Sequence, residues 1–261
     1  LLDAGGIRAA LPTAAAALLD ELQVVWSTVS TNTELLRCSA PERGSRVMLA
    51  ERQTGGRGRR GRDWASPLAA HIYLSVLRGF AGGLAQLGGL SLVAGVAVAE
   101  ALRGLGHAQV QLKWPNDLVV DGHKLGGLLV EGGGEFAGPA RAVIGIGLNV
   151  HMPPAFAERI DQPWTDLDQL AGEPVQRTAV ATAVLAALLP ALEQFEAEGL
   201  APFLPRYAAL DSLAGRDVRV QLGGAWQDGR ALGLAEDGAL RVEIEGREQP
   251  VHAGEVSVRA R

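Results

Sequence analysis

The sequence predicts an α+β protein made of a larger domain over residues 1–212 and a small β-barrel over residues 213–261. The 261 residues exceed the usual length of one domain. In the first part of the chain, strand patterns are interspersed with helical ones. The last part changes to short alternating strands separated by glycine and proline breaks.

Composition limits the kind of protein. Hydrophobic residues make up 48% of the chain and charged residues 20%, which is typical of a soluble globular protein. The formal net charge of −5 argues against general nucleic-acid affinity. The single cysteine, Cys38, cannot form an intramolecular disulfide and favours a reducing compartment. No uninterrupted apolar stretch is long enough to span a bilayer and the start lacks a signal-peptide pattern, so we expect a cytoplasmic protein without a membrane role.

The first elements are a strand, a helix and two further strands. Residues 24–29 predict a short strand, and Thr31 and Glu34 have the spacing of a helix capping box, so a helix should begin there. Alternating apolar residues then predict two half-buried strands, one at Val47 and Leu49 and one at Ile72, Leu74 and Val76.

A buried helix and a run of strands follow. The apolar helical pattern covers residues 84–105, with Gly104 and Gly106 as stops. Residues 110–113 and 118–120 predict strands, and Asp121-Gly122 is a strong two-residue hairpin turn into a strand over residues 124–131.

Residues 143–150 predict a strand with two unlike faces. One face carries Ile144, Ile146, Leu148 and Val150, and the other carries Val143, Gly145, Gly147 and Asn149. The aliphatic face suits a core, whereas the glycine face lets a ligand or another backbone lie on the sheet. The alternative is that the glycines only relieve packing under a helix.

The rest of the chain predicts one core helix and the barrel. A helical spacing of apolar residues covers Leu185, Leu188, Leu189, Leu192 and Phe195, with Pro190 as a kink and Gly199 as a terminator. Barrel strands are predicted at Val218, Val220 and Leu222, at Leu240, Val242 and Ile244, and at Val256 and Val258.

The sharpest local feature is the Gly-Arg loop, residues 55–62, which places four arginines on a glycine-rich backbone. Such a loop suits a polyanion, because guanidinium groups bind phosphate or carboxylate in bidentate fashion and glycine frees backbone N–H groups. An RGG-like nucleic-acid segment is disfavoured by acidic surroundings and the lack of interleaved aromatic residues. A merely solvated basic loop stays open, and a Walker motif is excluded because no Gly-Lys-Ser/Thr follows.

A second feature is Lys113-Trp114-Pro115-Asn116-Asp117 followed by Lys124-Leu125-Gly126-Gly127. It puts a lysine, a carboxylate and small glycines on two arms of one hairpin. The lysine would stabilise negative charge that develops on a carboxylate or phosphate, and the aspartate would orient or deprotonate an amine. The alternative is a surface lysine and a turn-capping aspartate.

Together these motifs resemble the biotin protein ligases, in order from about Leu22 to Arg259. The residues that carry the resemblance are Ser30-Thr31-Asn32, Gln53 with the Gly-Arg loop and Trp64, KWPNDL from Lys113, KLGG from Lys124 and GIGLNV from Gly145. The resemblance implies a biotin- and ATP-binding catalytic domain on a mixed sheet related to class II aminoacyl-tRNA synthetases, followed by the small barrel.

The resemblance also implies the site residues. The biotin-binding set is Ser30, Thr31, Asn32, Gln53, Gly56, Arg57, Trp64, Lys124, Gly127 and Gly145. The ATP- and adenylate-binding set is Arg57, Arg59, Arg60, Arg62, Asn116, Lys124, Asn149 and Arg259, and the catalytic set is Lys124, Arg59 and Asp117. Trp64 would close over biotin, and the Gly-Arg loop would fold over the adenylate after being disordered in the empty enzyme. Asn116 and Lys113 are expected mainly to shape their turn.

The implied reaction joins biotin to a lysine of the biotin carboxyl carrier domain of acetyl-CoA carboxylase, with ATP, Mg²⁺ and a biotinyl-adenylate intermediate. The magnesium ligands cannot be identified from the sequence. A homodimer is compatible with the resemblance. Because the chain starts at Leu1 without the winged helix of bifunctional members, we expect no operator binding, and both a removed repressor domain and a naturally short ligase stay open. The rival hypotheses are a lipoate protein ligase and a biotin-sensing regulator.

Overall fold

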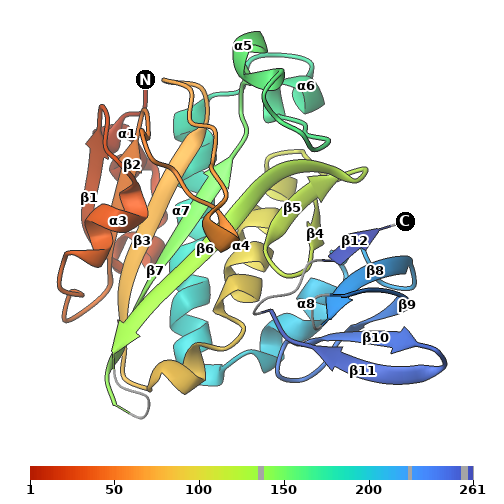
Figure 1. The fold of residues 1–261 in the computed structure, drawn as a ribbon. Coiled ribbons are helices and arrows are strands. Elements are labelled where there is room, and N and C mark those ends of the chain that lie inside the picture. Colours follow the sequence, from red (N-terminus) through yellow and green to blue (C-terminus); the bar gives the residue numbers. More distant parts are fainter. Residues whose placement is uncertain (135–137, 223–224, 254–257, 261) are drawn as a thin grey trace.

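The computed structural model describes residues 1–134, 138–222, 225–253 and 258–260, and it builds them into two β-sheets with helices packed around the larger one (Figure 1). The larger sheet has seven strands in the order β1-β2-β3-β7-β6-β5-β4. Their bounds are β1 Leu19–Val25, β2 Ser45–Ala50, β3 Ile72–Phe80, β4 Gln111–Lys113, β5 Asp117–Val120, β6 His123–Gly134 and β7 Ala140–Leu148.

The larger sheet is mixed. Strands β1 and β2 run parallel, and every other neighbouring pair is antiparallel. The turn between β5 and β6 is the expected Asp121-Gly122, and both residues have positive φ, 49° and 78°, as a two-residue hairpin of this kind needs. The mixed sheet implied by the family resemblance is therefore confirmed.

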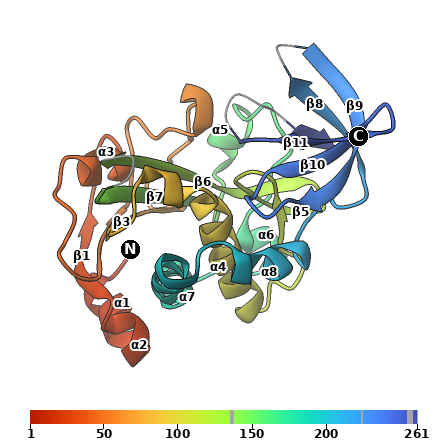
Figure 2. The ribbon, with the colours of Figure 1, turned by 90° about the horizontal axis from the view of Figure 1, so that it is seen from below.

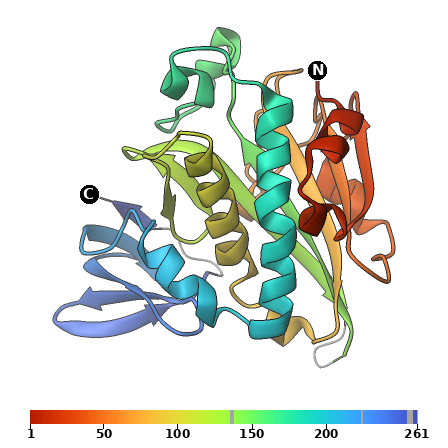
Figure 3. The same ribbon diagram turned by 180° about the vertical axis from the view of Figure 1, so that it is seen from behind.

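Helices lie on both faces of this sheet. Seen from behind, α4 (Leu90–Gly104) and α7 (Arg177–Glu198) run side by side across one face (Figure 3). The short α3 (Thr31–Leu36) lies on the opposite face, as the view from below shows (Figure 2). The other helices are α1 Ala4–Ala10, α2 Thr13–Ala16, α5 Pro154–Ala157, α6 Leu167–Ala171 and α8 Leu204–Ala208, with 3₁₀ turns η1 Arg59–Gly61, η2 Leu84–Leu87 and η3 Ala201–Phe203.

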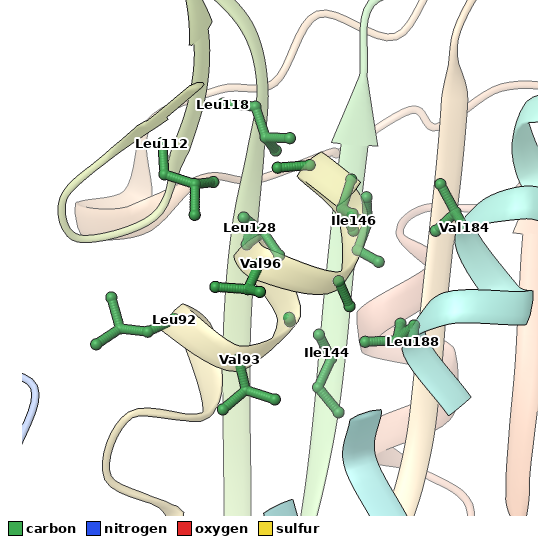
Figure 4. Close-up of a cluster of buried hydrophobic side chains, with 14 of the residues drawn as sticks. Leu92, Val93, Val96, Leu112, Leu118, Leu128, Ile144, Ile146, Val184 and Leu188 are labelled. Atoms are coloured by element: carbon green, nitrogen blue, oxygen red, sulfur yellow. The ribbon is translucent and has the colours of Figure 1, made fainter. Parts of the chain in front are cut away.

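The core lies between the sheet and the helix pair. Ile144 and Ile146 of β7 point toward α4 and α7, where they meet Val96 and Leu188 (Figure 4). Each fully buried aliphatic side chain of this kind stabilises the fold by roughly 1.5–3 kcal/mol. The aliphatic face predicted for this strand is thus confirmed as the core face.

Helix α7 differs from one expectation. It is long and apolar enough to cross a membrane by length and composition, a property that the sequence analysis overlooked. Half of its most apolar window is buried inside the fold, where it packs against α4. Its apolar residues therefore serve as core, as predicted for Leu188 and Phe195, and Gly199 ends it with φ of 71°.

Other elements begin at different residues than expected. The cap of α3 is Ser30, whose hydroxyl accepts the Thr33 N–H at 3.4 Å, so the predicted capping box at Thr31 and Glu34 is wrong by one residue. The Glu34 carboxylate instead accepts from Thr28 Oγ1 and Arg37. Strand β1 starts at Leu19 and ends at Val25, and the helix expected from residue 84 begins only at Leu90.

The C-terminal residues form a separate five-stranded antiparallel sheet in the order β11-β10-β9-β8-β12. Its strands are β8 Asp217–Leu222, β9 Ala225–Leu234, β10 Leu240–Ile244, β11 Arg247–Val251 and β12 Val258–Ala260. Strands β9 and β11 were not predicted, and part of the predicted strand at Val256 lies outside the described residues. Trp114 Nε1 donates to the Gly238 carbonyl at 3.1 Å, which ties the β4–β5 hairpin to this sheet.

Candidate active site

The site is built on the face of the large sheet that carries α3. Cross-strand register places Ser75, Gly145 and Leu129 in one row, and Tyr73, Gly147, Gly127 and Asp117 in the next row along the strands. Residues two apart on one strand lie roughly 7 Å from each other on the same face. Most of these positions have small side chains, so groups from loops can lie directly on the sheet.

The first row lies beneath the N-terminus of α3. Thr31 and Asn32, in its first turn, are both almost fully buried. Gln53 Oε1 accepts from the Thr31 backbone N–H at 2.9 Å and lies 3.2 Å from Thr31 Oγ1. This contact joins the segment after β2 to the start of α3, and it brings three predicted biotin-binding residues together.

Hydrogen bonds connect these residues to two that the sequence analysis missed. Ser75 Oγ lies 2.7 Å from Thr31 Oγ1 and donates to Asn32 Oδ1 at 2.6 Å. Asn32 Nδ2 donates to Glu131 Oε2 at 2.8 Å and to the Leu129 carbonyl at 3.2 Å. A serine within the apolar first part of β3, residues 72–77, was the sequence signal for this network.

The glycines of β7 make room for protein side chains. A Cβ atom on Gly145 would lie 2.4 Å from Asn32 Oδ1, and one on Gly147 would lie 2.5 Å from the Trp64 ring. Asn32 belongs to α3, so Gly145 does relieve packing under a helix, as the alternative interpretation held, whereas the Trp64 ring above Gly147 comes from the loop before β3. Gly56 is also closely enclosed, with a virtual Cβ 2.9 Å from Gln53 Nε2.

The second row holds the predicted catalytic pair. Lys124 Nζ lies 2.7 Å from Asp117 Oδ1, and both side chains are about one-fifth exposed, 19% and 24%. The ammonium group also lies 5.6 Å from the centroid of the Trp64 ring, within cation–π range. Gly127 lies beneath both charged groups, because its virtual Cβ would be 3.4 Å from Lys124 Nζ and 3.5 Å from Asp117 Oδ1.

Backbone contacts fix Lys124. Its N–H donates to the Pro163 carbonyl, and its own carbonyl accepts from the Thr165 N–H and from Asn149 Nδ2 at 3.3 Å. Asn149 Nδ2 also donates to the Thr165 carbonyl. Asn149, predicted to bind ATP, therefore contacts the backbone that carries Lys124.

The Gly-Arg loop is folded over this region. Arg57 donates to Thr33 Oγ1 at 3.1 Å, and Arg59 donates to Asn116 Oδ1 at 3.4 Å and to the Ala253 carbonyl. Burial lowers the pKa of the Arg59 guanidinium, and Asp117 acts in the opposite direction. Arg59 thus connects the hairpin of the catalytic pair with the C-terminal sheet.

Three other predicted adenylate-binding residues lie on the Gly-Arg loop and on β12. Arg60 has φ of 60° in the 3₁₀ turn, and Arg62 is exposed on the same loop. Arg259 belongs to β12, but its side chain lies outside the described residues. Asn116 also donates to the Leu128 carbonyl at 2.6 Å, which is the turn-shaping role expected for it.

This site contains no preformed metal cluster among the described residues, and a large cavity lies elsewhere on the sheet. Among the described residues, His, Cys, Asp and Glu side chains form no group of three that could hold a metal ion. A cavity of about 940 Å³ lies at the other end of the sheet, lined by residues such as Arg78, Arg141 and Glu196, and contains none of the predicted site residues. In the hydrogen-bonded cluster, by contrast, Asn32 and Trp64 fill the space above Gly145 and Gly147.

Comparison with known proteins identifies the family. Residues 22–149 match the Biotin/lipoate A/B protein ligase family, and residues 214–259 match the biotin protein ligase C-terminal domain. The chain is 40% identical to the bifunctional ligase/repressor BirA of Salmonella typhimurium, over 100% of the chain and 79% of that protein. It is 36% identical to the biotin–[acetyl-CoA-carboxylase] ligase of Mycobacterium tuberculosis, over 90% of the chain and 88% of that protein.

A solved structure shows the same fold. The biotin protein ligase of Aquifex aeolicus in complex with biotin and ATP aligns with a TM-score of 0.77 and 28% identity, over 93% of this chain and 100% of the other. The chain belongs to the biotin protein ligase family, and its fold and relatives support biotin ligation over lipoate ligation or a purely regulatory role.

Proposed function

We propose that the chain activates biotin with ATP to biotinyl-5′-adenylate and transfers the biotinyl group to a lysine of the biotin carboxyl carrier domain of acetyl-CoA carboxylase. The observation that carries this proposal is the placement of the Lys124–Asp117 pair one row away from the polar cluster of Thr31, Asn32 and Gln53. A ligand with a polar ring at the cluster and a carboxylate at Lys124 would span the two rows. The ligase relatives and the biotin- and ATP-bound Aquifex structure support this choice of substrates.

Biotin would lie with its ring system against the first row. Ser30, Thr31 and Gln53 offer polar groups there, and Asn32 lies on Gly145 beneath them. Trp64 would cover the ligand next to Lys124, while Gly56 and Arg57 would bring loop backbone close to it. The close approach of Gly56 to Gln53 supports the last assignment.

In the first half-reaction, an oxygen of the biotin carboxylate attacks the α-phosphorus of ATP, the bond from that phosphorus to the β-bridging oxygen breaks, and pyrophosphate leaves. Both reactants are anionic, so cationic groups must lower their repulsion. Lys124, Arg57 and Arg59 would supply this positive charge: Lys124 pairs with Asp117 on the reacting row, Arg57 binds Thr33, and Arg59 binds Asn116 next to Asp117. Arg60 and Arg62 would support the folded loop, and Asn116, Asn149 and Arg259 complete the proposed ATP-binding set.

Magnesium would neutralise charge on the phosphates of ATP. Mg²⁺ usually keeps several waters and is held by one or two carboxylates plus substrate phosphates, so it does not need a protein-built cage. Asp117 is the carboxylate of the reacting row that would serve it, and its Oδ1 also binds Lys124. The assignment of Mg²⁺ therefore rests on the chemistry of ATP.

In the second half-reaction, the amine of the acceptor lysine attacks the acyl carbon of the adenylate, the bond from that carbon to the phosphate oxygen breaks, and AMP leaves. The amine must lose a proton as the amide forms. Asp117 would orient the amine and accept that proton, since its carboxylate lies beside Lys124 on the reacting row.

We further propose a domain boundary near residue 213 and a cytoplasmic location. We also propose that these residues do not bind an operator, and that a homodimer is the assembly to test.

The proposal is tested by measuring pyrophosphate release and acceptor labelling together, with Mg²⁺-ATP, a biotin carboxyl carrier domain, and either biotin or lipoate. We expect labelling with biotin alone. Labelling with lipoate alone would move the activity to lipoate ligation. Biotin-dependent pyrophosphate release without labelling would contradict the transfer step and favour a sensor of biotin.

A further inference from the structure

Residues that the proposed function does not use decide whether the Thr31 hydroxyl donates or accepts a hydrogen bond toward a ligand. Glu131 Oε2 and the Leu129 carbonyl only accept hydrogen bonds, and both lie within hydrogen-bond distance of the same end of the Asn32 amide. That end must therefore be the NH₂ group. Asn32 Oδ1 then faces Ser75, and because this oxygen only accepts, the Ser75 hydroxyl proton must point to it.

The position of the Ser75 proton also fixes the position of the Thr31 proton. With its proton committed to Asn32, Ser75 Oγ can only accept, so the close Thr31–Ser75 contact at 2.7 Å requires Thr31 to be the donor. The Thr31 hydroxyl then has lone pairs but no proton to offer a ligand. Gln53 Oε1 accepts from the Thr31 N–H at 2.9 Å and lies 3.2 Å from Thr31 Oγ1, so it is a longer, second acceptor for the same Thr31 proton. Gln53 Nε2 remains a donor on the other side.

We propose that Ser75 and Glu131 are positioning residues that hold the Thr31 hydroxyl as a hydrogen-bond acceptor, so that the site selects a ring with an N–H donor at that point. A cyclic urea carries such N–H groups beside a carbonyl acceptor. The inference rests on the proposed function for the identity of that ligand, and it adds that the ligand must present a hydrogen-bond donor to the Thr31 hydroxyl. Asn32, in this arrangement, orients Thr31 through Ser75, and its own polar atoms are engaged within the protein.

Burial makes this arrangement strict. Ser75 is fully buried, and Thr31 and Asn32 are 3% and 4% exposed. A buried donor or acceptor that loses its partner costs roughly 1–3 kcal/mol. The hydrogen bonds from Thr31 to Ser75 and from Ser75 to Asn32 therefore cannot exchange donor and acceptor without leaving a polar atom of the Asn32 amide unsatisfied.

The test compares biotin with an analogue in which the ureido N–H groups are replaced by ring oxygens, using wild type and Ser75→Ala. Binding is measured by calorimetry without ATP. Ser75→Ala removes the close acceptor at 2.7 Å and leaves the Thr31 proton only the longer contact to Gln53 Oε1 at 3.2 Å. We therefore expect biotin binding to weaken about tenfold, the change that corresponds to about 1.4 kcal/mol. Binding of the oxygen analogue should stay the same or improve. The KM for ATP should not change.

The chain supplies a matched control. Ser45 is also a fully buried serine of this sheet, on β2, and its hydroxyl has no hydrogen-bond partner among the described residues. Ser45→Ala should leave the biotin-to-analogue ratio at the wild-type value. Equal weakening of both ligands by Ser75→Ala, or no weakening of either, would overturn the inference.

A second pair of variants covers the case in which Ser75→Ala does not fold. Glu131→Met removes the acceptor that fixes the Asn32 amide, whereas Glu131→Gln keeps an oxygen that can accept from Asn32 Nδ2. We expect Glu131→Met to lower the biotin-to-analogue ratio and Glu131→Gln to preserve it; the same ratio in both would overturn the inference. If wild type itself binds no biotin, the proposed function fails, whereas wild-type binding with unaltered ratios in the variants refutes only the positioning roles.

Discussion

Gly145→Ala is the substitution that tests the architecture of the site most directly. The new methyl group would lie 2.4 Å from Asn32 Oδ1, 2.9 Å from its Cγ and 3.0 Å from its Nδ2. Real contacts of a methyl carbon are longer than 3.0 Å, so the Asn32 amide must move. It cannot move freely, because hydrogen bonds to Ser75, Glu131 and Leu129 hold it.

The size of the effect follows from those contacts. A net contribution of about 1 kcal/mol for each of the three hydrogen bonds gives a loss of about 3 kcal/mol in the free energy of unfolding. The displaced amide also releases Ser75 and hence Thr31, so biotin affinity should fall at least tenfold, since about 1.4 kcal/mol corresponds to a factor of ten.

Urea unfolding and biotin-binding calorimetry measure both effects. Gly133→Ala is the matched control, because Gly133 lies on β6 and a Cβ there meets nothing within 4 Å. It carries the same change in unfolded-chain entropy, roughly 0.4–1 kcal/mol in favour of alanine. If Gly145→Ala were as stable as Gly133→Ala and bound biotin like wild type, the position assigned to Asn32 above Gly145 would be wrong.

Three further substitutions test other parts of the molecule. Lys124→Ala should slow pyrophosphate release by at least a hundredfold, given that charge stabilisation in a transition state is worth about 2.7–4 kcal/mol. Lys113 lies opposite Asp117 on β4 and is expected mainly to shape its turn, so Lys113→Ala should retain most of the rate in a stopped-flow assay. Arg59→Gly removes the link to Asn116 and Ala253, so free adenylate should escape and label bystander lysines; mass spectrometry that finds only the acceptor lysine labelled would remove Arg59 from this role. Burial lowers the pKa of His71 from 6.5 to about 4, so the folded protein favours the neutral imidazole and loses stability as pH falls from 6.5 toward 4. Between pH 7 and pH 5, the free energy of unfolding of wild type should fall by about 2 kcal/mol more than that of His71→Asn. Equal losses in urea unfolding would refute the assignment.

The two faces of β7 show what the sequence could predict and why. Alternation of aliphatic residues and glycine depends only on the period of a strand, so the core face and the site face followed directly from it. What covers the glycines depends on distant segments. Asn32 and Trp64 reach β7 from parts of the chain far away in sequence, and no local pattern sets their register.

Other differences have local physical reasons. Ser30 and Thr31 are both good helix caps, and the choice between them depends on whether the carboxylate of Glu34 binds the helix start or Thr28. Strand β11 was missed because Pro250 argues against a strand, yet β11 is an edge strand, where proline is tolerated.

The sequence predicted some residues of the candidate site and missed others. Motifs shared with a family name the residues for which we propose direct roles, such as Lys124 and Gln53. Ser75 and Glu131 act one contact further away and belong to strands that look ordinary in sequence. Their hydrogen bonds appear only when β3, β6 and α3 are placed together.

The glycine rows also have a consequence for engineering this chain to take other ligands. The core face of β7 should accept exchanges among Ile, Val and Leu, since cores tolerate apolar swaps that conserve volume. The site face has almost no room for added atoms, because the space above Gly145 and Gly147 is already filled by Asn32 and Trp64. A variant with a larger pocket must therefore be sought by shortening those two covering side chains, and random libraries at the glycines should return few folded members.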